Sequence, residues 1–552
     1  MIKPPFPHEF DEKESLIRLP VNVTYHSKLR APAWAHPTRE SASHAIRCFG
    51  SPDEEDHIVG RKILERLLPL QTTDSTDLHY GIWGWFAEEP TREMAPADWN
   101  WADFIGVRLL QILHDHAGHL PPDLAARTRA AAEHAAWSIF RRNVGPGYTN
   151  ICAMGAVVCI VSGEMFSDPR LLEYGVRRLS NMRRELEFHG GFPEYNSPTY
   201  TLVVLEELER LLHLARHPRA RADAEALLAF AWSLIAEQFH PGTGQWAGAQ
   251  SRSYQDWIDL EKVRFLEARL GKPFPVQPLT SLVIEPIEKG FPHPCPESVR
   301  ARFFQLPVSP SQYRHTWIKQ ADGTPRQIST TWFTPEATLG SMNRENTWNQ
   351  RRVILGYWRA SESSLARVRL RLLHNGNDFV SASTRNQQEN SRILTGFHFA
   401  AGGGDYHPYF DRPPDGTFFT SDLRIRYEVE GHGALVRKLA PDLFELSVGT
   451  HKIVLRTGPL RFDGKVVPGW TVGREKQLVW VDGVFYAGAK RAFNPAQLAE
   501  CTAAAALELL PADQAPSTHS IEESELGDER VFRWQAQGVF EVSVPRIAPK
   551  FD

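Results

Sequence analysis

The sequence has few cysteines, no long apolar run and no excess of positive charge. No apolar run approaches the ~18 residues that a membrane-spanning helix needs. The formal net charge of −4 and the lack of a basic block argue against nucleic acid as a partner. The cysteines are scattered, odd in number and free of Cys-x-x-Cys spacing, which argues against a disulfide framework or a zinc knuckle. They are Cys48, Cys152, Cys159, Cys295 and Cys501.

The beginning of the sequence, Met1 to His8, has no apolar segment of the kind found in signal peptides. The expected location is therefore the cytoplasm, with no membrane partner. The chain has 552 residues, a length typical of about three or four domains, although large all-α toroids often run as one. A hydrophobic content of 42% and a charged content of 23% are ordinary for a globular protein. A homo-oligomer is compatible with this composition.

The first half of the chain, from about residue 56 to residue 271, has apolar residues at helical spacing. The connections are short and carry Pro or Gly, and helices joined in this way pack antiparallel. Repeated hairpins of this kind build a ring or a solenoid. The predicted helices are His57–Leu68, Trp101–His116, Pro122–Arg141, Asn150–Glu164, Pro169–Phe188, Ser197–Arg216, Arg219–Phe239 and Tyr254–Leu270.

The second half has a different period. Prolines at 273, 275, 278, 286, 292, 294 and 296 predict a linker. Beyond it, short β-branched and aromatic runs without intervening helices indicate antiparallel sheets packed as a sandwich. The predicted strands are Val353–Trp358, Val368–Leu373, Leu423–Val429, Leu443–Val448, Lys452–Arg456, Leu478–Trp480 and Val539–Val544. The predicted domains are an N-terminal extension (1–55), an (α/α) toroid catalytic domain (56–271), the linker (272–300) and an antiparallel β-sandwich (301–552).

The segment from His189 to Tyr200, His-Gly-Gly-Phe-Pro-Glu-Tyr-Asn-Ser-Pro-Thr-Tyr, holds the densest group of reactive side chains. Its two glycines and two prolines predict a rigid, irregular turn, because glycine permits unusual φ angles and proline fixes φ. A helix is predicted to follow directly. Polar, titratable groups are therefore expected on a loop at a helix mouth, where chemistry is often placed.

This segment and several others resemble the heparinase II/III-type and alginate-lyase-type polysaccharide lyases. The other segments are Gly145–Asn150, Ser251–Tyr254, Leu339–Arg344 and Gly396–Phe399, so that the resemblance covers roughly residues 80–411. The resemblance implies an incomplete (α/α) toroid followed by an antiparallel β-sandwich. It also implies cleavage at C4 of a uronic acid by β-elimination, with an acidic oligosaccharide or polysaccharide as the partner. No cofactor is predicted.

β-Elimination removes a weakly acidic proton from C5 and builds negative charge on the adjacent carboxylate. Asn, His, Arg or a metal must neutralise that charge, because aimed donors are needed in a dry site. A base must reach C5, and an acid must protonate the departing O4. A tyrosine can take either role if a nearby cation lowers its pKa. The predicted acid–base residues are Tyr200, His189, His398 and Tyr254.

Neutralisation of the substrate carboxylate is predicted for Asn150, Asn196 and Arg252, the last as a bidentate fork. Each candidate also has a structural interpretation. Asn150 and Asn196 would cap helices, and Arg252 would form a salt bridge. Tyr200 would be a packing residue, and His189 would lie against the C-terminal dipole of its helix.

Tryptophan is concentrated between residues 83 and 101, where four indoles occur in nineteen positions. Indole faces stack on sugar rings in many carbohydrate clefts, while helix packing is the alternative. The further predicted substrate contacts are Trp83, Trp99, Asn100, Trp101, Glu194 and Arg344.

Two other functions remain open in the sequence. A glycoside hydrolase would use Glu194 with Asp103 or Glu88, at a carboxylate separation that depends on the mechanism. A non-catalytic glycan-binding protein would keep the tryptophans and make Tyr200 and His189 dispensable. A divalent-metal site at His398, with Asp405 and His407, is a further alternative. The favoured prediction is a lyase for short oligosaccharides with an exo-type pocket.

Overall fold

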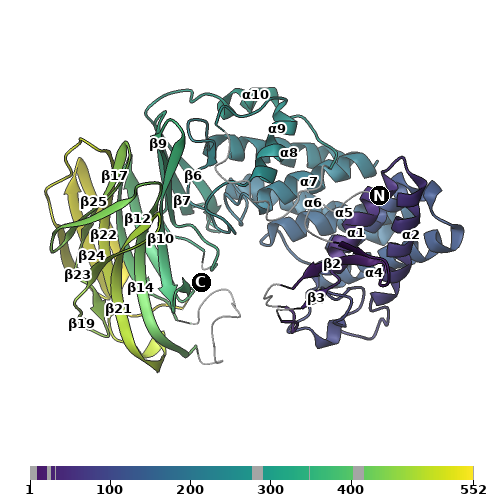
Figure 1. The fold of residues 1–552 in the computed structure, drawn as a ribbon, viewed down its shortest axis with the longest axis horizontal. Coiled ribbons are helices and arrows are strands. Elements are labelled where there is room, and N and C mark those ends of the chain that lie inside the picture. Colours follow the sequence, from purple (N-terminus) through teal and green to yellow (C-terminus); the bar gives the residue numbers. More distant parts are fainter. Residues whose placement is uncertain are drawn as a thin grey trace. The chain divides into compact units, whose positions relative to one another are not determined.

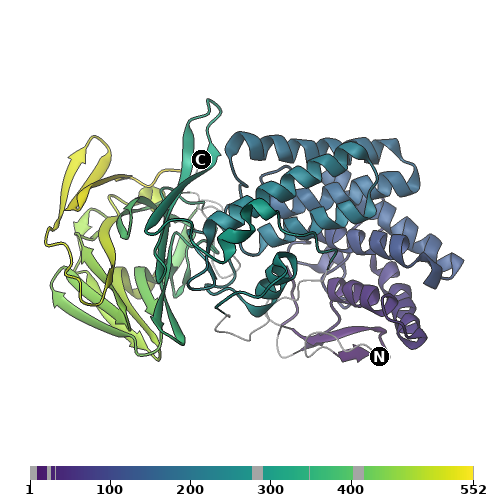
Figure 2. The same cartoon turned by 90° about the horizontal axis from the view of Figure 1, so that it is seen from above.

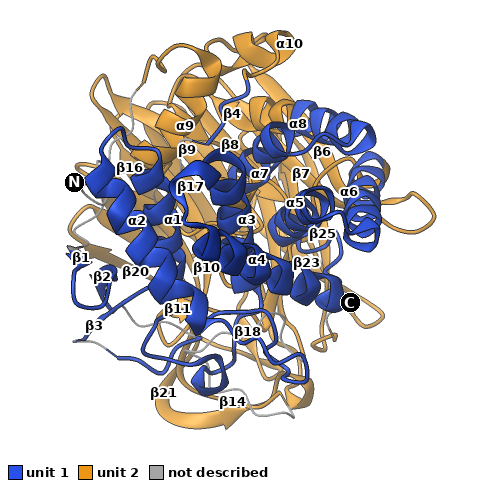
Figure 3. Ribbon diagram, turned by 90° about the vertical axis from the view of Figure 1, so that its right-hand side faces the viewer, with its two compact units in different colours: residues 1–187, 202–231, 285–293 blue, residues 188–201, 232–284, 294–552 orange. Residues whose placement is uncertain are grey.

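The computed structural model describes residues 9–21, 26–30, 33–276, 290–346, 348–401 and 416–550. Its internal contacts divide the chain into two units, coloured separately in Figure 3. The helical unit comprises Met1–Glu187, Leu202–Ala231 and Glu285–His293. The sheet unit comprises Phe188–Thr201, Trp232–Ile284 and Pro294–Asp552. Two stretches of the helical half of the sequence, residues 188–201 and 232–271, therefore belong to the sheet unit.

The helices of the first half pack as successive neighbours. Helix α3 packs on α4 and α5, and α1 packs on α2 and α3. Figure 2 shows the helices of the first half gathered beside one another. Three short strands, β1 (Glu9–Asp11), β2 (Leu16–Pro20) and β3 (Trp34–Ala35), form an antiparallel sheet before them. The helices are α1 (Thr38–Phe49), α2 (Glu54–Leu67), α3 (Asn100–Asp115), α4 (Pro122–Arg142), α5 (Thr149–Phe166), α6 (Pro169–His189), α7 (Tyr200–Leu214) and α8 (Pro218–Gln238).

Seven of the predicted helices coincide with α2 to α8 to within about three residues. Helix α1 is additional and lies inside the predicted N-terminal extension. Its buried face is made largely of small or polar residues such as Ala42, Ala45 and His44, which give little apolar period. The sequence pattern therefore did not reveal it.

Helix α5 is the most apolar element of the helical unit. Among the residues that the structure describes, it is the one helix long and apolar enough to cross a membrane by length and composition. However, 83% of it is buried inside the protein, as in the core helix of a globular fold.

The eighth predicted helix begins later than expected. Helix α9 spans Leu260–Leu270, and Asp259 caps it by accepting a hydrogen bond from the main-chain nitrogen of Lys262 at 2.9 Å. Tyr254 therefore lies in a loop and not in a helix. This loop follows the hairpin of β4 (Phe239–His240) and β5 (Gln245–Trp246).

The second half forms two large antiparallel sheets (Figure 1). One is built from β6 (Ser311–Lys319), β7 (Pro325–Phe333), β8 (Ala337–Met342), β9 (Ile354–Ser361), β10 (Ser364–His374), β11 (Asn377–Asp378), β14 (Phe418–Glu430), β20 (Trp470–Glu475) and β21 (Leu478–Phe493). The other is built from β12 (Ala382–Glu389), β13 (Arg392–Phe399), β15 (Leu435–Ala440), β16 (Leu443–Val448), β17 (His451–Thr457) and β22 (Thr502–Pro511). The predicted strands in β16, β17 and β25 (Gly538–Pro545) match the observed bounds to within one residue. The other four predictions fall in β9, β10, β14 and β21, which extend further than predicted.

The core of the sandwich lies between these two sheets. Leu339 and Trp358 from the first sheet share one buried cluster with Phe397 and Leu455 from the second. A third sheet, of β23 (Ile521–Leu526), β24 (Glu529–Ala536) and β25 (Gly538–Pro545), covers the outer face of β13 and β22 with a second core. The remaining short elements are α10 (Glu297–Arg300), β18 (Arg461–Phe462) and β19 (Lys465–Val466). The predicted order of a helical part followed by antiparallel sheets is confirmed.

Candidate active site

The turn between α6 and α7 is fixed by contacts within the sheet unit. Gly190 has φ +96°, and its carbonyl accepts a hydrogen bond from His315 Nε2 at 2.7 Å. Gly191 lies so close to Trp317 that an added Cβ would meet the ring at 2.4 Å. Ser197 Oγ accepts from the main-chain nitrogen of Tyr200 at 3.2 Å. Ser197 therefore caps α7, and Tyr200 is the first residue of that helix.

Asn196 holds this turn to the segment after β5. It has a left-handed φ of +46°, a conformation that asparagine tolerates better than most residues. Its Nδ2 donates to the carbonyls of Ala247 and Ala249 at 2.8 and 2.9 Å, and its Oδ1 accepts from Trp246 Nε1 at 2.6 Å. The side chain is buried and used inside the protein. Its predicted roles as a carboxylate ligand and as a helix cap are therefore corrected.

The loop after β5 lies between this turn and the segment before β9. The main chains of Gln250 and Arg352 exchange two hydrogen bonds, of 2.9 and 2.7 Å. On the other side, the nitrogen of Ser251 donates to the carbonyl of Tyr195 at 3.0 Å. Ser197 Oγ also donates to the carbonyl of Arg252 at 2.6 Å. The loop thus brings Ser251 and Arg252 of the Ser251–Tyr254 motif to the start of α7.

Tyr200 and Tyr254 form a phenol pair. Their hydroxyl oxygens are 2.6 Å apart, and their ring centroids are 6.1 Å apart. The two environments differ, because Tyr200 is 9% exposed whereas Tyr254 is 48% exposed. One phenol of the pair therefore faces solvent and the other lies behind it. Two of the predicted acid–base residues are in direct contact.

Arg252 supports this phenol pair from the protein side. Its guanidinium carbon lies 4.4 Å from the ring centre of Tyr200 and 4.5 Å from that of Trp348. Its Nη1 donates to Glu194 Oε1 at 2.8 Å, and its Nε donates to Gln350 Oε1 at 2.8 Å. With only 6% of its side chain exposed, Arg252 is a buried ion-pair residue. The prediction that Arg252 forks the substrate carboxylate is therefore corrected in favour of the salt bridge.

The pKa of Tyr200 lies well above the ordinary value of a phenol. Burial is the main cause, since it disfavours the phenolate, and the neighbouring Tyr254 adds to it. The Arg252 cation lowers the pKa but does not outweigh burial. The condition that a nearby cation lower the pKa of the tyrosine below its ordinary value is therefore not met at Tyr200 in the resting protein. Tyr200 holds its proton at neutral pH.

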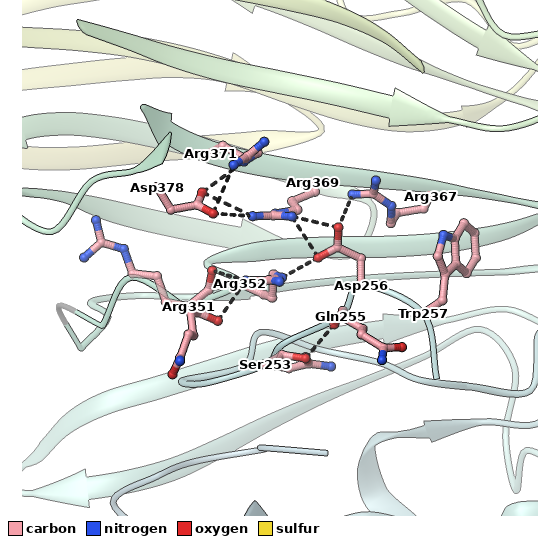
Figure 4. Close-up of polar contacts among 12 residues, drawn as sticks. Ser253, Gln255, Asp256, Trp257, Arg351, Arg352, Arg367, Arg369, Arg371 and Asp378 are labelled. Atoms are coloured by element: carbon pink, nitrogen blue, oxygen red, sulfur yellow. Dashed lines mark hydrogen bonds and ion pairs between the residues drawn. The ribbon is translucent and has the colours of Figure 1, made fainter. Parts of the chain in front are cut away.

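Asp256, two residues after Tyr254, fixes the far end of the loop (Figure 4). Its carboxylate contacts Arg352 Nε, Arg367 Nη1 at 2.9 Å and Arg369 Nη1 at 2.7 Å. Its main-chain carbonyl accepts a hydrogen bond from the hydroxyl of Tyr357. Burial alone would raise the pKa of Asp256, but the three guanidinium groups hold it well below the usual value. Asp256 is therefore an ionised anchor between the loop and the large sheet.

A narrow pocket adjoins the same loop. Its lining includes Thr199 and Ser253, which neighbour the two tyrosines in sequence, together with Asp256 and Trp257. The pocket has room for about one water molecule and not for a sugar ring. Water can therefore approach the loop from this side, while Tyr254 has its own exposed surface.

His189 is the last residue of α6 and is half-buried. Its Nδ1 accepts a hydrogen bond from the main-chain nitrogen of Lys319 in β6 at 3.0 Å, and its ring packs edge-on against Phe188. These contacts agree with the structural interpretation of a histidine at a helix C-terminus. Its acid–base role stays a prediction.

His398 lies in β13 and not in a loop, and it is 2% exposed. Its Nδ1 donates to the carbonyl of Phe399 at 2.9 Å. Burial, and after it the charge of Arg385, lower its pKa to about 3, so the imidazole is neutral. The prediction that His398 is an acid–base residue is corrected, because its imidazole is buried in a strand. Arg344 lies in the turn after β8, half-buried, and its charge also lowers the pKa of His398.

The alternative metal site at His398 cannot be assembled from the described residues, since Asp405 and His407 lie outside them.

Asn100 and Asn150 belong to the helical unit. Asn100 donates from Nδ2 to the hydroxyl of Tyr148 at 3.0 Å and accepts from Arg142 at 2.6 Å. Asn150 is the second residue of α5 and is 2% exposed, so it lies inside the helix and does not cap it. Substrate binding by these two amides stays a prediction.

Two of the predicted sugar-stacking tryptophans are packing residues. Trp83 is completely buried and donates to the carbonyl of Leu67 at 3.1 Å. Trp101 is 6% exposed, donates to Thr38 Oγ1 at 2.9 Å and stacks on Trp85. Their ring faces are covered, so the prediction that they stack on a sugar is corrected. Trp99 is half-buried and keeps part of its surface open.

Two of the carboxylates proposed for a hydrolase are buried, and the third is exposed but paired with a histidine. Glu194 is buried against Arg252, and Asp103 is 1% exposed. Glu88 accepts a hydrogen bond from His36 Nδ1. A hydrolase needs two carboxyl groups that reach the glycosidic bond from either side. These three positions do not favour that chemistry.

Asp103 gives a prediction about stability and pH. Burial raises its pKa from 3.8 to about 7, although Arg178 and Arg142 oppose the shift. A raised folded-state pKa stabilises the protein below 3.8, and this stabilisation is lost as the pH rises through 7. Asp103→Asn should remove that loss, so the variant should gain stability relative to the wild type across this range. Urea unfolding at several pH values measures the difference.

The matched control for this experiment is Asp513→Asn, at an exposed turn. Its stability difference from the wild type should stay nearly constant over the same pH range. Parallel curves for Asp103→Asn and the wild type would refute the raised pKa of Asp103.

Comparison with known proteins finds one family model and several solved structures that are similar to this chain. A family described as "Domain of unknown function (DUF8769)" matches residues 20–263. No curated protein sequence matches significantly. A crystal structure of heparinase III is similar at 11% identity and a TM-score of 0.47, over 95% of this chain and 85% of that chain. A second heparinase III structure is similar at 9% identity and a TM-score of 0.38, over 92% and 83% of the two chains.

A third similar structure is the chondroitin AC lyase of Streptomyces coelicolor in complex with chondroitin sulphate. It has 12% identity and a TM-score of 0.44, over 89% of this chain and 78% of that chain. These proteins are polysaccharide lyases, the group that the sequence motifs resemble. TM-scores below 0.5 at such identities establish neither substrate nor mechanism.

Two contributors to the site were not predicted. Asp256 follows the Ser251–Tyr254 motif directly, and a carboxylate beside a loop tyrosine was the available signal. Trp348, which covers the second face of Arg252, had no comparable signal because it is about one hundred residues away in sequence.

Proposed function

We propose that the protein is a lyase that cleaves a uronate-containing oligosaccharide or polysaccharide by β-elimination, with Tyr200 and Tyr254 as its acid–base pair. The contact of 2.6 Å between the two phenol oxygens, beside the Arg252 guanidinium, carries the proposal. A hydrogen bond this short lets a proton pass from one oxygen to the other with little movement of either ring.

The proton inventory of the reaction fits two phenols. A neutral phenol cannot accept a proton, so the pair enters the reaction with Tyr254 as a phenolate and Tyr200 holding one proton. As C5 loses its proton to the Tyr254 phenolate oxygen, the C5–H electrons form the C4–C5 double bond and the C4–O4 bond breaks. The departing O4 takes a proton from the same pair. The two tyrosines therefore begin and end the reaction with the same number of protons, and neither an oxidant nor a reductant is needed.

The two environments suggest a division of labour between the phenols. Tyr254 is the exposed phenol and is placed to meet the sugar. Tyr200 has a raised pKa and acts as the proton reserve behind it. When negative charge develops on a phenol oxygen, the nearby Arg252 cation stabilises it. Glu194 and Gln350 hold Arg252 in that position.

An acidic glycan is the substrate that this chemistry requires. The C5 proton is acidic enough to remove only when a carboxyl group is attached to C5, so the target residue is a uronic acid. Arg252 already forms an ion pair with Glu194, so we assign it no contact with the carboxylate of the substrate.

The test is incubation of the purified full chain with a panel of uronate oligosaccharides of different linkage. We expect ultraviolet absorbance from the new C4–C5 double bond, and products lighter by one water than those of hydrolysis. New reducing ends without the chromophore would refute elimination and favour a hydrolase. Binding of the same oligosaccharides without cleavage would make the protein a glycan-binding protein.

A further inference from the structure

A separate cluster of metal-ligating side chains lies in the helical unit, where α3 and α7 end. Asp115 is the last residue of α3. Its Oδ1 lies 2.6 Å from Nδ1 of His114 and 2.8 Å from Nε2 of His213. One ligand atom from each of the three residues falls within 4.8 Å of the others. The proposed reaction uses none of these groups.

The imidazole rings of this cluster are oriented by aromatic packing. The ring of His213 stacks on Phe291 at a centroid distance of 3.7 Å and an interplanar angle of 12°. The ring of His114 meets that of His213 edge-on, at 5.3 Å and 65°. Aromatic packing, in addition to the hydrogen bonds, therefore holds in place both imidazole nitrogens that face Asp115.

We propose that His114, Asp115 and His213 bind one divalent transition-metal ion, with zinc as the best match. Two imidazole nitrogens and one carboxylate oxygen are a donor set that zinc uses, whereas magnesium and calcium prefer oxygen ligands throughout. Tetrahedral zinc with bonds of about 2.0–2.1 Å spaces its ligands by about 3.3 Å. Asp115 Oδ1 would thus move away from each nitrogen by about half an ångström.

The ends of the two helices add a second reason for a cation here. Helix α3 ends at Asp115 and α7 ends at Leu214. The last carbonyls of a helix carry partial negative charge, which favours a cation placed beside them. Both helix ends therefore attract the ion that the three side chains would hold.

The ion would cross-link two distant parts of the sequence. Asp115 and His213 are 98 positions apart, one on each helix. An ion that binds the folded chain and not the unfolded chain stabilises the fold by mass action. A water molecule would complete the coordination as the fourth ligand. The bound ion would thus cross-link α3 and α7.

The experiment uses untagged, full-length protein stripped with a chelator and then titrated with zinc chloride by calorimetry. We expect one equivalent of zinc to bind and to raise the unfolding temperature. His114→Gln, Asp115→Asn and His213→Gln should each weaken zinc binding at least tenfold. His432→Gln, an exposed histidine of the sheet unit, is the matched control and should bind zinc as the wild type does.

Cobalt substitution provides a readout that is independent of stability. Visible absorbance of Co²⁺ reports its coordination, and we expect the His213→Gln variant to lose the spectrum that the wild type shows. Circular dichroism checks that each variant is folded. Failure of the wild type to bind one equivalent, or unchanged binding in all three ligand variants, would overturn the proposal. Neither result bears on the elimination reaction, which is measured without added metal.

Discussion

Replacing Tyr200 by Phe is expected to lower kcat/KM on a uronate oligosaccharide by about 10²–10⁴-fold, the usual contribution of a positioned acid–base group. The substitution removes the single oxygen that lies 2.6 Å from the Tyr254 hydroxyl, and it leaves the ring beneath Arg252. Because that oxygen is buried, it adds little to binding of the ground state. The loss should therefore fall on kcat, measured by the absorbance of the unsaturated product.

The companion variants make this result specific. Tyr254→Phe should cause a loss of the same order, and the double variant should be little worse than the more damaged single variant, because the two phenols act as a unit. Tyr486→Phe is the control, since its hydroxyl donates to the carbonyl of Ala489 elsewhere in the sheet unit. If folded Tyr200→Phe protein kept more than about a tenth of the activity, the phenol pair would not be the acid–base machinery.

Asp256→Asn is expected to destabilise the protein by about 3–5 kcal/mol, the usual penalty for removing one partner of a buried ion pair. The change leaves Arg352, Arg367 and Arg369 close together without the carboxylate that they share. Urea unfolding followed by fluorescence measures the loss. Activity should fall as well, because the loop that carries Tyr254 loses its anchor to the large sheet.

Asp322→Asn serves as the matched control for the stability measurement. Asp322 lies at an exposed turn between β6 and β7. Its replacement should change the free energy of unfolding by less than about 0.5 kcal/mol. A loss below about 1 kcal/mol for Asp256→Asn would show that the arginines find other partners. The carboxylate of Asp256 would then not be the anchor of the loop.

The order of helices and strands was predictable because periodic burial is written in the sequence. The prediction of helix bounds failed where helix capping or small buried side chains hide the apolar period. Helix α1 buries Ala42, Ala45 and other small residues and so gives little signal. Helix α9 starts six residues late because Asp259, and no earlier residue, caps it.

The sequence predicted which residues meet in the candidate site better than it predicted the role of each residue. The motifs around Glu194, Tyr200, Arg252 and Tyr254 do meet in space. However, residue type does not reveal which polar groups are already satisfied by one another. Arg252 is neutralised by Glu194, an outcome fixed by tertiary contact. The burial of His398 in β13 is likewise set by sheets that form around it.

Both reactive phenols are encoded in the helical half of the sequence, yet several of the groups that hold them in place come from beyond residue 340. Trp348 and Gln350 hold Arg252, while Arg367 and Arg369 hold Asp256. A recombinant fragment that stops after α9 would thus contain every atom of the tyrosine pair without its scaffold. Attempts to isolate a minimal enzyme, or to graft this chemistry onto another helical protein, must carry the first sheet along with it.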